Sequence, residues 1–340
     1  MKKHSKIFLI AEIAQAHEGS LGIAHSYIDA LSKTGVNAIK FQTHIAEAES
    51  SEYEKFRVKF SYEDDTRFDY WKRMEFTLDQ WIGLKKHCDD VGLEFISSPF
   101  SCMAIDLLEK VGVKKYKIGS GEVNNRLLID KICKTGKDIF LSSGMSSYNE
   151  LDEAIGWINL HQNQVSVFQC TTNYPTSPEE WGLNVIREMK NRYQIPVGFS
   201  DHSGEIYASL SAVTLGAELL EFHAVFNKEM FGPDTKASLT IDQILQLVKG
   251  VQQIEEATNV QVNKNQNQKF SELKDIFGKS LCVNKDLKAG HILNFDDLEA
   301  KKPKNKGVDA SLYLDVLGRT LNKDINKWNF LNYNDILKDS

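Results

Sequence analysis

The amino-acid sequence predicts a (β/α)8 barrel, and two patterns lead to this fold class. Short apolar runs rich in β-branched and aromatic residues recur along the chain, and a helical pattern follows most of them. Strand–helix alternation repeated eight times is typical of parallel βαβ units. A doubly wound open sheet is the alternative, but the first strand leads into Gln15–Gly19 and not into a glycine-rich dinucleotide motif.

Each element of this barrel can be placed on the sequence. The expected strands are Ile7–Ala14, Ala38–Thr43, Glu94–Phe100, Tyr116–Glu122, Ile139–Met145, Val165–Tyr174, Pro196–His202 and Leu219–Phe226. The expected helices include Ala24–Lys33, Leu78–Val91, Ala104–Val111, Leu127–Lys134, Tyr148–Leu160, Leu183–Arg192, Ile206–Leu215 and a last one over Ile241–Ala257. Several are followed by a glycine, the residue that most readily ends a helix: Gly35, Gly92, Gly112, Gly136 and Gly216.

The chain length leaves room for a second module. A barrel takes ~250 residues, and the chain has 340. We expect the barrel over residues 1–258, a polar linker over 259–269 and a small β-rich module over 270–340, with β-like runs at 279–283 and 312–316. So small a module buries little core by itself, so it is expected to pack against the barrel or a partner subunit.

Composition excludes several classes of protein. A formal net charge of −6 argues against non-specific nucleic-acid binding. The five cysteines are scattered without a C-x-x-C pair, which fits free thiols in a reducing compartment. No signal-peptide pattern is present, and no apolar stretch approaches the ~20 residues that span a bilayer. The sequence therefore predicts a cytoplasmic enzyme that binds neither nucleic acid nor membrane.

One connection is unlike the others. Residues 44–75 are polar and charged, with interspersed aromatic side chains. A loop this long in a compact domain is usually a functional lid or an insertion. Because it follows the second strand, we expect it to rise over the C-terminal mouth of the barrel.

Polar residues occupy the C-terminal end of every expected strand, where barrels of this type carry their catalytic groups. They are Glu12; Lys40, Gln42 and Thr43; Ser97 and Ser98; Lys117, Ser120 and Glu122; Ser142 and Ser143; Thr171, Thr172, Asn173 and Tyr174; Ser200, Asp201 and His202; and His223. Any one serine or threonine could simply cap the next helix. Eight polar strand ends in succession indicate a site.

The two lysines within apolar strands have two interpretations. A buried ammonium is costly without a partner, so Lys40 and Lys117 could be paired with a carboxylate such as Glu12 or Glu122. Alternatively, together with Ser120, Ser142 and Ser200, they form a cradle for a phosphate or a carboxylate.

His202 and His223 end neighbouring strands and could share one divalent ion, or could be hydrogen-bonded without metal. Two imidazoles leave an open site, which favours manganese, magnesium or cobalt over structural zinc. Glu12, Glu122 and Asp234 are the acidic candidates for acid–base chemistry or for binding sugar hydroxyls.

Nine motifs, taken in order, resemble those of the sialic acid (N-acetylneuraminate) synthase family. They are A-E-I-A-Q-A-H-E-G, I-K-F-Q-T, S-S-P-F, Y-K-I-G-S-G-E, L-S-S-G-M, C-T-T-N-Y-P, G-F-S-D-H-S, L-E-F-H and G-P-D. The C-terminal stretch resembles that family's antifreeze-like (SAF) module. The resemblance implies condensation of phosphoenolpyruvate with an N-acetylmannosamine-type aldose, giving a 3-deoxy-nonulosonic acid and phosphate.

The resemblance also assigns roles to residues. Phosphoenolpyruvate would be held by Lys40, Lys117, Ser120, Ser142, Thr172 and Ser200. The metal, manganese first and magnesium or cobalt as alternatives, would be held by His202 and His223. The sugar would face Glu12, Gln42, Glu122, Tyr174, Asp234 and Lys302. Glu122 is the first candidate for proton transfer and Glu12 the second, with Lys117 also catalytic. The family further implies a domain-swapped homodimer.

Two departures concern the sugar. The family's N-H-N-G is A-H-E-G here, at Ala16–Gly19, and its K-R-P-G is K-K-P-K, at Lys301–Lys304. Lys302 thus stands where an arginine is usual, and lysine cannot make a guanidinium's bidentate contact. A legionaminate, pseudaminate or other 3-deoxy-ulosonate synthase is therefore an alternative, as is a sugar-binding barrel without chemistry.

Overall fold

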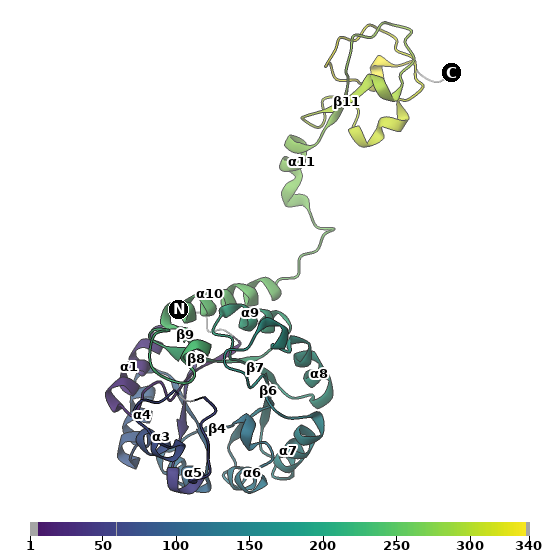
Figure 1. The fold of residues 1–340 in the computed structure, drawn as a ribbon. Helices are drawn as coiled ribbons and strands as arrows, with labels where there is room; N and C mark the ends of the chain where they lie inside the picture. Colours follow the sequence, from purple (N-terminus) through teal and green to yellow (C-terminus); the bar gives the residue numbers. More distant parts are fainter. Residues whose placement is uncertain (1–5, 59, 338–340) are drawn as a thin grey trace. The chain divides into compact units, whose positions relative to one another are not determined.

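In the computed structural model, which describes residues 6–58 and 60–337, eight parallel strands pair in chain order and the eighth pairs with the first. This closed ring, with helices outside it, confirms the (β/α)8 barrel (Figure 1). The strands are β1 (Phe8–Ala14), β2 (Ala38–Thr43), β3 (Glu94–Pro99), β4 (Lys115–Ile118), β5 (Asp138–Ser142), β6 (Val165–Cys170), β7 (Val197–Asp201) and β8 (Leu219–Val225). A short β9 (Leu239–Thr240) pairs with β8.

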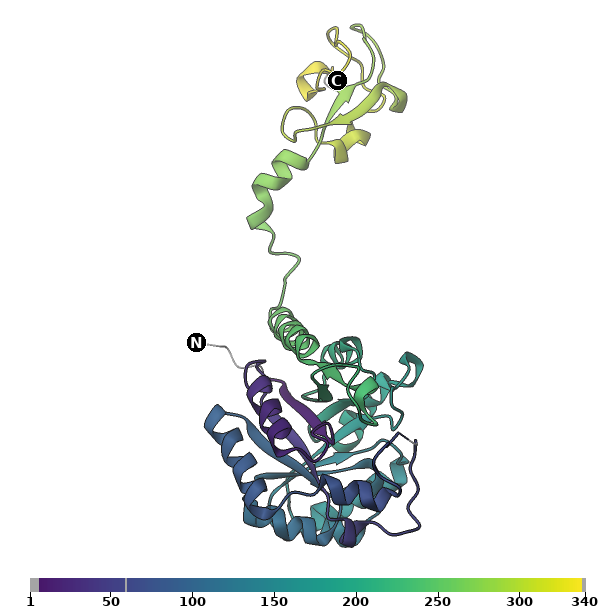
Figure 2. The same cartoon turned by 60° about the vertical axis from the view of Figure 1, so that its left-hand side comes forward.

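The outer layer consists of helices that pack on the strands and on one another. They are α1 (Leu21–Leu31), α2 (Ala46–Glu49), α3 (Arg67–Met74), α4 (Leu78–Val91), α5 (Cys102–Val111), α6 (Arg126–Cys133), α7 (Tyr148–Leu160), α8 (Leu183–Tyr193), α9 (Ile206–Thr214) and α10 (Ile241–Thr258). In Figure 2, the purple α1 lies beside the blue α4 on the outside of the barrel. Side-chain caps begin many of them, with full capping boxes at Thr77, Ser147 and Thr240.

Three strands end three or four residues earlier than the sequence predicts, and one of them, β5, stops at Ser142 and not at Met145. β4 stops at Ile118, and Ser120–Glu122 form a 3-10 turn after Gly119. β6 stops at Cys170, so Thr172 and Tyr174 lie in the following loop. In each place polar residues continue an apolar run, and period-two alternation alone does not mark where pairing stops.

The barrel interior has an apolar layer and a polar one. Ile10, Ala38, Ile96, Phe140, Phe168 and Leu219 form a buried cluster inside the ring. Because side chains alternate across a strand, the residues two positions further along β1, β2 and β8 point inward as well, and these are Glu12, Lys40 and Glu221. The register places Glu12 opposite Lys40 on β2 and opposite His223 on β8. The fold itself therefore brings these charged groups together.

The chain divides into two units, Met1–Val260 and Gln261–Ser340. The second contains α11 (Ser271–Phe277), the antiparallel pair β10 (Ser280–Val283) and β11 (Leu298–Lys301), and a small apolar core that includes Leu281, Val316 and Leu331. The expected β-like run at 312–316 is wrong, because Ala310–Asp315 form 3-10 turns. Asp309 starts these turns by accepting a hydrogen bond from Ser311 N at 3.0 Å.

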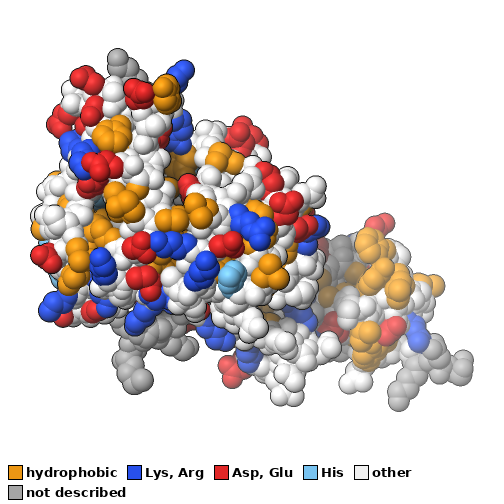
Figure 3. Space-filling model, turned by 90° about the horizontal axis from the view of Figure 1, so that it is seen from below, with side chains coloured by type: hydrophobic (Ala, Val, Ile, Leu, Met, Phe, Trp, Pro, Cys, Tyr) orange, Lys and Arg blue, Asp and Glu red, His pale blue; other side chains and the backbone are white. Residues whose placement is uncertain are grey.

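The barrel's outer surface mixes charges of both signs (Figure 3). Pairs between neighbouring helices contribute to this pattern, such as Lys131 on α6 with Asp106 on α5 at 2.6 Å. No helix in the described part of the chain is long and apolar enough to cross a membrane.

Candidate active site

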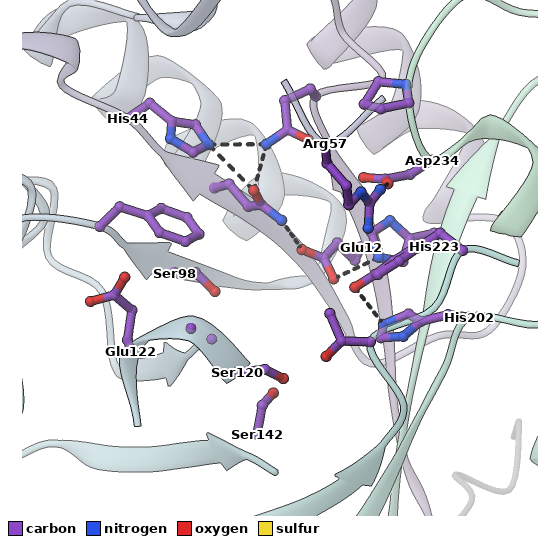
Figure 4. A pocket seen from close by; sticks show the side chains of 18 of the residues that line it. Glu12, His44, Arg57, Ser98, Ser120, Glu122, Ser142, His202, His223 and Asp234 are labelled. Carbon is purple, nitrogen blue, oxygen red and sulfur yellow. Dashed lines mark hydrogen bonds and ion pairs between the residues drawn. The ribbon is translucent and has the colours of Figure 1, made fainter. Parts of the chain in front are cut away.

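A cavity of about 370 Å³ opens at the C-terminal ends of the strands. Twelve of the residues singled out from the sequence line it: Glu12, Lys40, Gln42, Ser120, Glu122, Ser142, Thr172, Tyr174, Ser200, His202, His223 and Asp234. Its size is within the usual range for a small-molecule site. Figure 4 shows these side chains converging from several strands.

The floor of the cavity is a network of four buried charges, of which Glu12, Lys40 and Glu221 line the cavity and Lys117 does not. Lys40 Nζ lies 2.8 Å from Glu12 Oε1 and 3.3 Å from Glu221 Oε1, and Lys117 Nζ lies 2.7 Å from the same Glu221 oxygen. All four side chains are at most 4% exposed. Two ammonium groups and two carboxylates balance one another, so the floor carries no net charge before a ligand binds.

Burial and the neighbouring charges have opposite effects on the pKa values of these groups. Burial disfavours both ammonium groups, but the pKa of Lys40 is raised because Glu12 and Glu221 both face it. The pKa of Lys117 is lowered by burial, which its single bond to Glu221 does not offset. Burial likewise acts to raise the pKa of Glu12, yet the charges of Lys40 and His223 outweigh it and hold the pKa well below its usual range. Glu12 is therefore ionised.

Hydroxyl groups surround the lysines. Ser98 Oγ lies 3.4 Å from Lys40 Nζ, and Ser200 Oγ donates to Glu221 at 3.1 Å. Ser120 Oγ accepts a hydrogen bond from Gly144 N at 3.1 Å, and a side chain at Gly144 would collide with Ser120 and Thr172. Thr172 Oγ1 is buried without a partner in the structure. A buried, unsatisfied hydroxyl in a cavity marks a place where a ligand could supply the missing hydrogen bond.

The two histidines lie side by side, with ring centroids 5.4 Å apart. His202 Nδ1 is 2.8 Å from the carbonyl oxygen of Thr171, a contact that requires the proton on Nδ1 and leaves the Nε2 lone pair directed into the cavity. Burial lowers the pKa of His202 to about 3, so its imidazole is neutral, the form that binds metal. His223 Nε2 lies 3.4 Å from Glu12 Oε2.

These residues fit an open divalent-metal site and not a closed one. Within residues 6–58 and 60–337, no group of three or more His, Cys, Asp or Glu side chains is arranged to hold a metal ion. Two imidazoles would therefore need water or substrate oxygens to complete the coordination shell. The identity of the metal, manganese first and magnesium or cobalt as alternatives, stays a prediction from the sequence.

Tyr174 and Asp234 form the side of the cavity next to the histidines. The Tyr174 hydroxyl lies 3.2 Å from His202 Nε2, and the two rings stack at 4.2 Å. Arg57, from the long connection, lies over the Tyr174 ring at 4.4 Å and pairs with Asp234 at 3.2 Å. The long connection thus reaches the residues that close the C-terminal end of β8.

Glu122 lies apart from the charged floor (Figure 4). Its Oε2 accepts a hydrogen bond from Asn125 at 2.7 Å, and burial raises its pKa. The interpretation that Glu122 pairs with a buried lysine is wrong, because the 3-10 turn after Gly119 carries it away from both. Gln42 donates to Glu12 Oε1 at 2.7 Å, so it positions that carboxylate as well as lining the cavity.

Sequence reasoning missed several residues of the site. The most important is Glu221, which joins both lysines; it lies two residues before His223 on the same strand, so period-two alternation could have revealed it. Others come from the long connection and the loop after β1, among them Gln15, His44, Glu49, Glu54, Arg57, Arg67 and Trp71. Lys302 belongs to the second unit, where its Nζ lies over the ring of Phe277 at 4.8 Å.

Comparison with known proteins agrees with this geometry. The NeuB family model matches residues 27–263. The N,N'-diacetyllegionaminic acid synthase of Campylobacter jejuni is 32% identical, with 94% of this chain and 97% of that protein covered. The human N-acetylneuraminate-9-phosphate synthase is 31% identical, with 92% and 88% covered.

A solved structure is also similar. The N-acetylneuraminic acid (sialic acid) synthetase of Leptospira borgpetersenii, in complex with citrate, has a TM-score of 0.70 at 27% identity, covering 79% of this chain and 90% of that one. The match to the family model extends over most of the barrel, and the relatives are similar over nearly the whole chain. The chain therefore belongs to the NeuB family, and the relatives described above are named as synthases of sialic and legionaminic acids.

Proposed function

We propose that this protein condenses phosphoenolpyruvate with an N-acetylmannosamine-type sugar, giving a 3-deoxy-nonulosonic acid and phosphate. The observation that carries the proposal is the buried floor, where Lys40, several hydroxyl groups and two histidines line one cavity and Glu221 joins Lys40 to Lys117. Family membership and the named activities of the relatives support the same reaction class.

Phosphoenolpyruvate would lie on the floor. Lys40 and Lys117 would offset its negative charge, while Ser120, Ser142, Thr172 and Ser200 would donate hydrogen bonds to its phosphate and carboxylate oxygens. Three of these donors are held in place before the substrate arrives, because Lys117 and Ser200 are bonded to Glu221 and Ser120 is bonded to Gly144 N. Preorganised donors of this kind stabilise developing charge without a reorganisation cost.

The sugar would lie above the floor, with its aldehyde toward the histidines. His202 and His223 would hold a divalent ion, manganese first among the candidates, which polarises a carbonyl oxygen when bound. Tyr174, Gln42 and Asp234 would orient the sugar by hydrogen bonds to its hydroxyl groups. Carbon 3 of phosphoenolpyruvate then attacks the aldehyde carbon, and the aldehyde oxygen takes a proton.

The two carboxylates differ in their readiness to transfer a proton. Burial raises the pKa of Glu122, so it can hold a proton to donate, whereas Lys40 keeps Glu12 ionised and a weak proton acceptor, suited to holding Lys40 in place. Water adds to carbon 2 and loses a proton, and the bond from carbon 2 to the bridging oxygen breaks. Phosphate leaves with that oxygen, and carbon 2 becomes the ketone of the product.

The second unit would complete the site from a partner subunit. We propose a homodimer in which the small unit, resembling a SAF module, presents Lys302 to the sugar of the partner's barrel. Lys302 stands in the family's arginine position and carries a single ammonium group, so it would make one hydrogen bond where a guanidinium makes two.

Phosphate release from phosphoenolpyruvate tests the proposal. The purified protein is assayed with manganese against a panel of 2-acetamido and 2,4-diacetamido hexoses, with chelated protein as the control. Release that requires both a sugar of the panel and the metal is the expected result. If the protein binds phosphoenolpyruvate but releases no phosphate with any sugar of the panel, the aldose is of another kind. If the protein does not bind phosphoenolpyruvate, the assignment of the floor is overturned.

A further inference from the structure

We infer that the sugar substrate carries no phosphate group, and that the lid of the cavity is built to exclude one. This inference rests on the proposed function and narrows its substrate class. The lid is the connection over residues 44–75, with α2 and α3 in it. The two relatives described above fall on either side of this distinction, since one is named as a 9-phosphate synthase and the other as a synthase of an unphosphorylated acid.

Every cation that lines the described part of the cavity on the lid side is already paired with a carboxylate. Arg57 lies 3.2 Å from Asp234, and Arg67 lies 3.1 Å from Glu54. Glu54 also accepts hydrogen bonds from Trp71 Nε1, at 3.1 and 3.3 Å, which hold it in place. A phosphate dianion placed here would have to displace a carboxylate before it reached a guanidinium.

The charge balance on this side is negative. Among the residues that the structure describes, the carboxylates Glu49, Glu54 and Asp234 line it, against two arginines. Glu49 pairs with His44 at 2.6 Å and is 6% exposed, so solvent screens it little. Like charges at an interface cost several kcal/mol when solvent is excluded, and a phosphorylated sugar would meet that cost.

The same side offers apolar surface for uncharged substituents. His44 is stacked between Trp71 and Phe100, at 3.9 and 4.7 Å, and Phe60 and Tyr70 continue this surface. A wall of aromatic rings suits the methyl group of an acetamido substituent or a deoxy carbon, and carboxylates beside it suit hydroxyl or amide N–H donors. The lid side therefore fits an acylamino sugar better than a sugar phosphate.

The floor shows what an anion site in this protein looks like. There the lysines are also paired, but Ser98, Ser120, Ser142, Thr172 and Ser200 supply hydroxyl donors around them, and the two histidines offer a place for a divalent cation. Among the described residues, the lid side offers the Tyr70 hydroxyl, which is buried without a partner, and a single histidine, His44, in place of a pair. The contrast explains how one cavity can admit phosphoenolpyruvate at one end and reject a second phosphate at the other.

The test compares N-acetylmannosamine and a 2,4-diacetamido-2,4,6-trideoxyhexose with N-acetylmannosamine 6-phosphate, by kcat/KM for phosphate release from phosphoenolpyruvate. We expect at least one uncharged sugar to exceed the 6-phosphate by on the order of a hundredfold. An equal or higher value for the 6-phosphate would overturn the inference and leave the proposed function standing. If none of the three sugars supports phosphate release, both the inference and the proposed function are overturned.

A charge variant of the lid provides the second arm. Glu54→Gln keeps an acceptor for Trp71 but removes the negative charge beside Arg67, so kcat/KM for the 6-phosphate sugar should rise roughly tenfold. Glu47→Gln is the matched control, because Glu47 belongs to the same lid, is 75% exposed and pairs with Lys72 outside the cavity. A 6-phosphate value that stays unchanged in Glu54→Gln, or rises equally in Glu47→Gln, would contradict exclusion by lid charge.

Discussion

The floor and the lid of the cavity are both rich in ion pairs, but the pairs differ in burial and therefore in what they do. On the floor, Lys40, Lys117, Glu12 and Glu221 lie on strands of the barrel and are shielded from water. Arg57 of the lid is 45% exposed, and its partner Asp234, in the loop after β8, is 19% exposed. The pair of His44 and Glu49 is an exception in the lid, at 2% and 6% exposed. Buried pairs hold their side chains in one geometry, and breaking such a pair lowers the stability of the fold strongly. Exposed pairs contribute about 1 kcal/mol or less to stability.

One lid contact is intermediate between these extremes. Arg73 on α3 binds Asp64 through Nε and Nη2, at 3.1 and 2.8 Å, and binds the Glu18 carboxylate through Nη1 at 2.9 Å. Glu18 precedes Gly19, whose φ of +75° and close approach to Arg73 O leave no room for a side chain. Arg73 thus ties the lid to the loop after β1, at the position where the sequence departs from its family.

The largest expected effect concerns the histidines of the floor. His223→Ala should lower kcat on the order of a thousandfold without unfolding the barrel, because it removes one of the two proposed metal ligands. Circular dichroism and kcat are measured together. His161→Ala, at a half-buried surface position, is the control. Full activity of His223→Ala after metal chelation would contradict the two-histidine site.

The next effect tests the buried charge network. Glu221→Gln leaves Lys117 without its ion pair at 2.7 Å, so the free energy of unfolding should fall by about 3 kcal/mol. Urea denaturation measures it. Glu218→Gln, at a residue 50% exposed and paired with Lys190, should cost less than about 1 kcal/mol. Equal losses in the two variants would show that burial does not distinguish the floor.

A pH effect follows from His17, which is 1% exposed beneath the loop that Arg73 contacts. Burial, then the nearby charges of His44 and Arg73, lower the pKa of His17 to about 3 from 6.5. The unfolded state binds the proton more tightly, so this group's contribution to stability is complete above pH 6.5 and is lost as the pH falls toward 3.

The variant His17→Asn should remove part of that acid sensitivity, because asparagine can still accept the hydrogen bond from Gly19 N, 3.0 Å in length. Between pH 7 and pH 4.5, the wild type should lose about 3 kcal/mol more stability than the variant. Urea denaturation at the two pH values measures the difference. Identical losses would mean that His17 is protonated in the folded protein.

The smallest effect concerns the tie between lid and barrel. Arg73→Gln should raise KM for the sugar about tenfold, with kcat and phosphoenolpyruvate binding little changed, because only the lid side loses its anchor. Trypsin should also cut faster at Lys55 and Arg57, both exposed in the lid. Arg192→Gln, which breaks a surface pair with Asp152, is the control. Unchanged proteolysis would show that Arg73 does not hold the lid.

The contrast between floor and lid also explains what the sequence could predict. The barrel and its polar strand ends follow from local period-two and helical patterns, and those patterns place Glu12, Lys40 and His223 on one inner face. The same rule extends to Glu221. By comparison, Arg57 and Asp234 are 177 residues apart, and no local pattern records that they meet. The predicted pairing of Glu122 with a buried lysine was wrong because Glu122 lies in a 3-10 turn and not on the strand.

The fate of oxygen during turnover tests the central claim most directly, namely that this cavity joins phosphoenolpyruvate to a sugar with cleavage of its carbon–oxygen bond. Turnover in H2(18)O with manganese and the preferred sugar is analysed by mass spectrometry of both products. The account predicts phosphate without the label and a nonulosonic acid that has gained it at carbon 2, measured before exchange. Labelled phosphate would instead show attack of water at phosphorus, and would contradict the synthase mechanism.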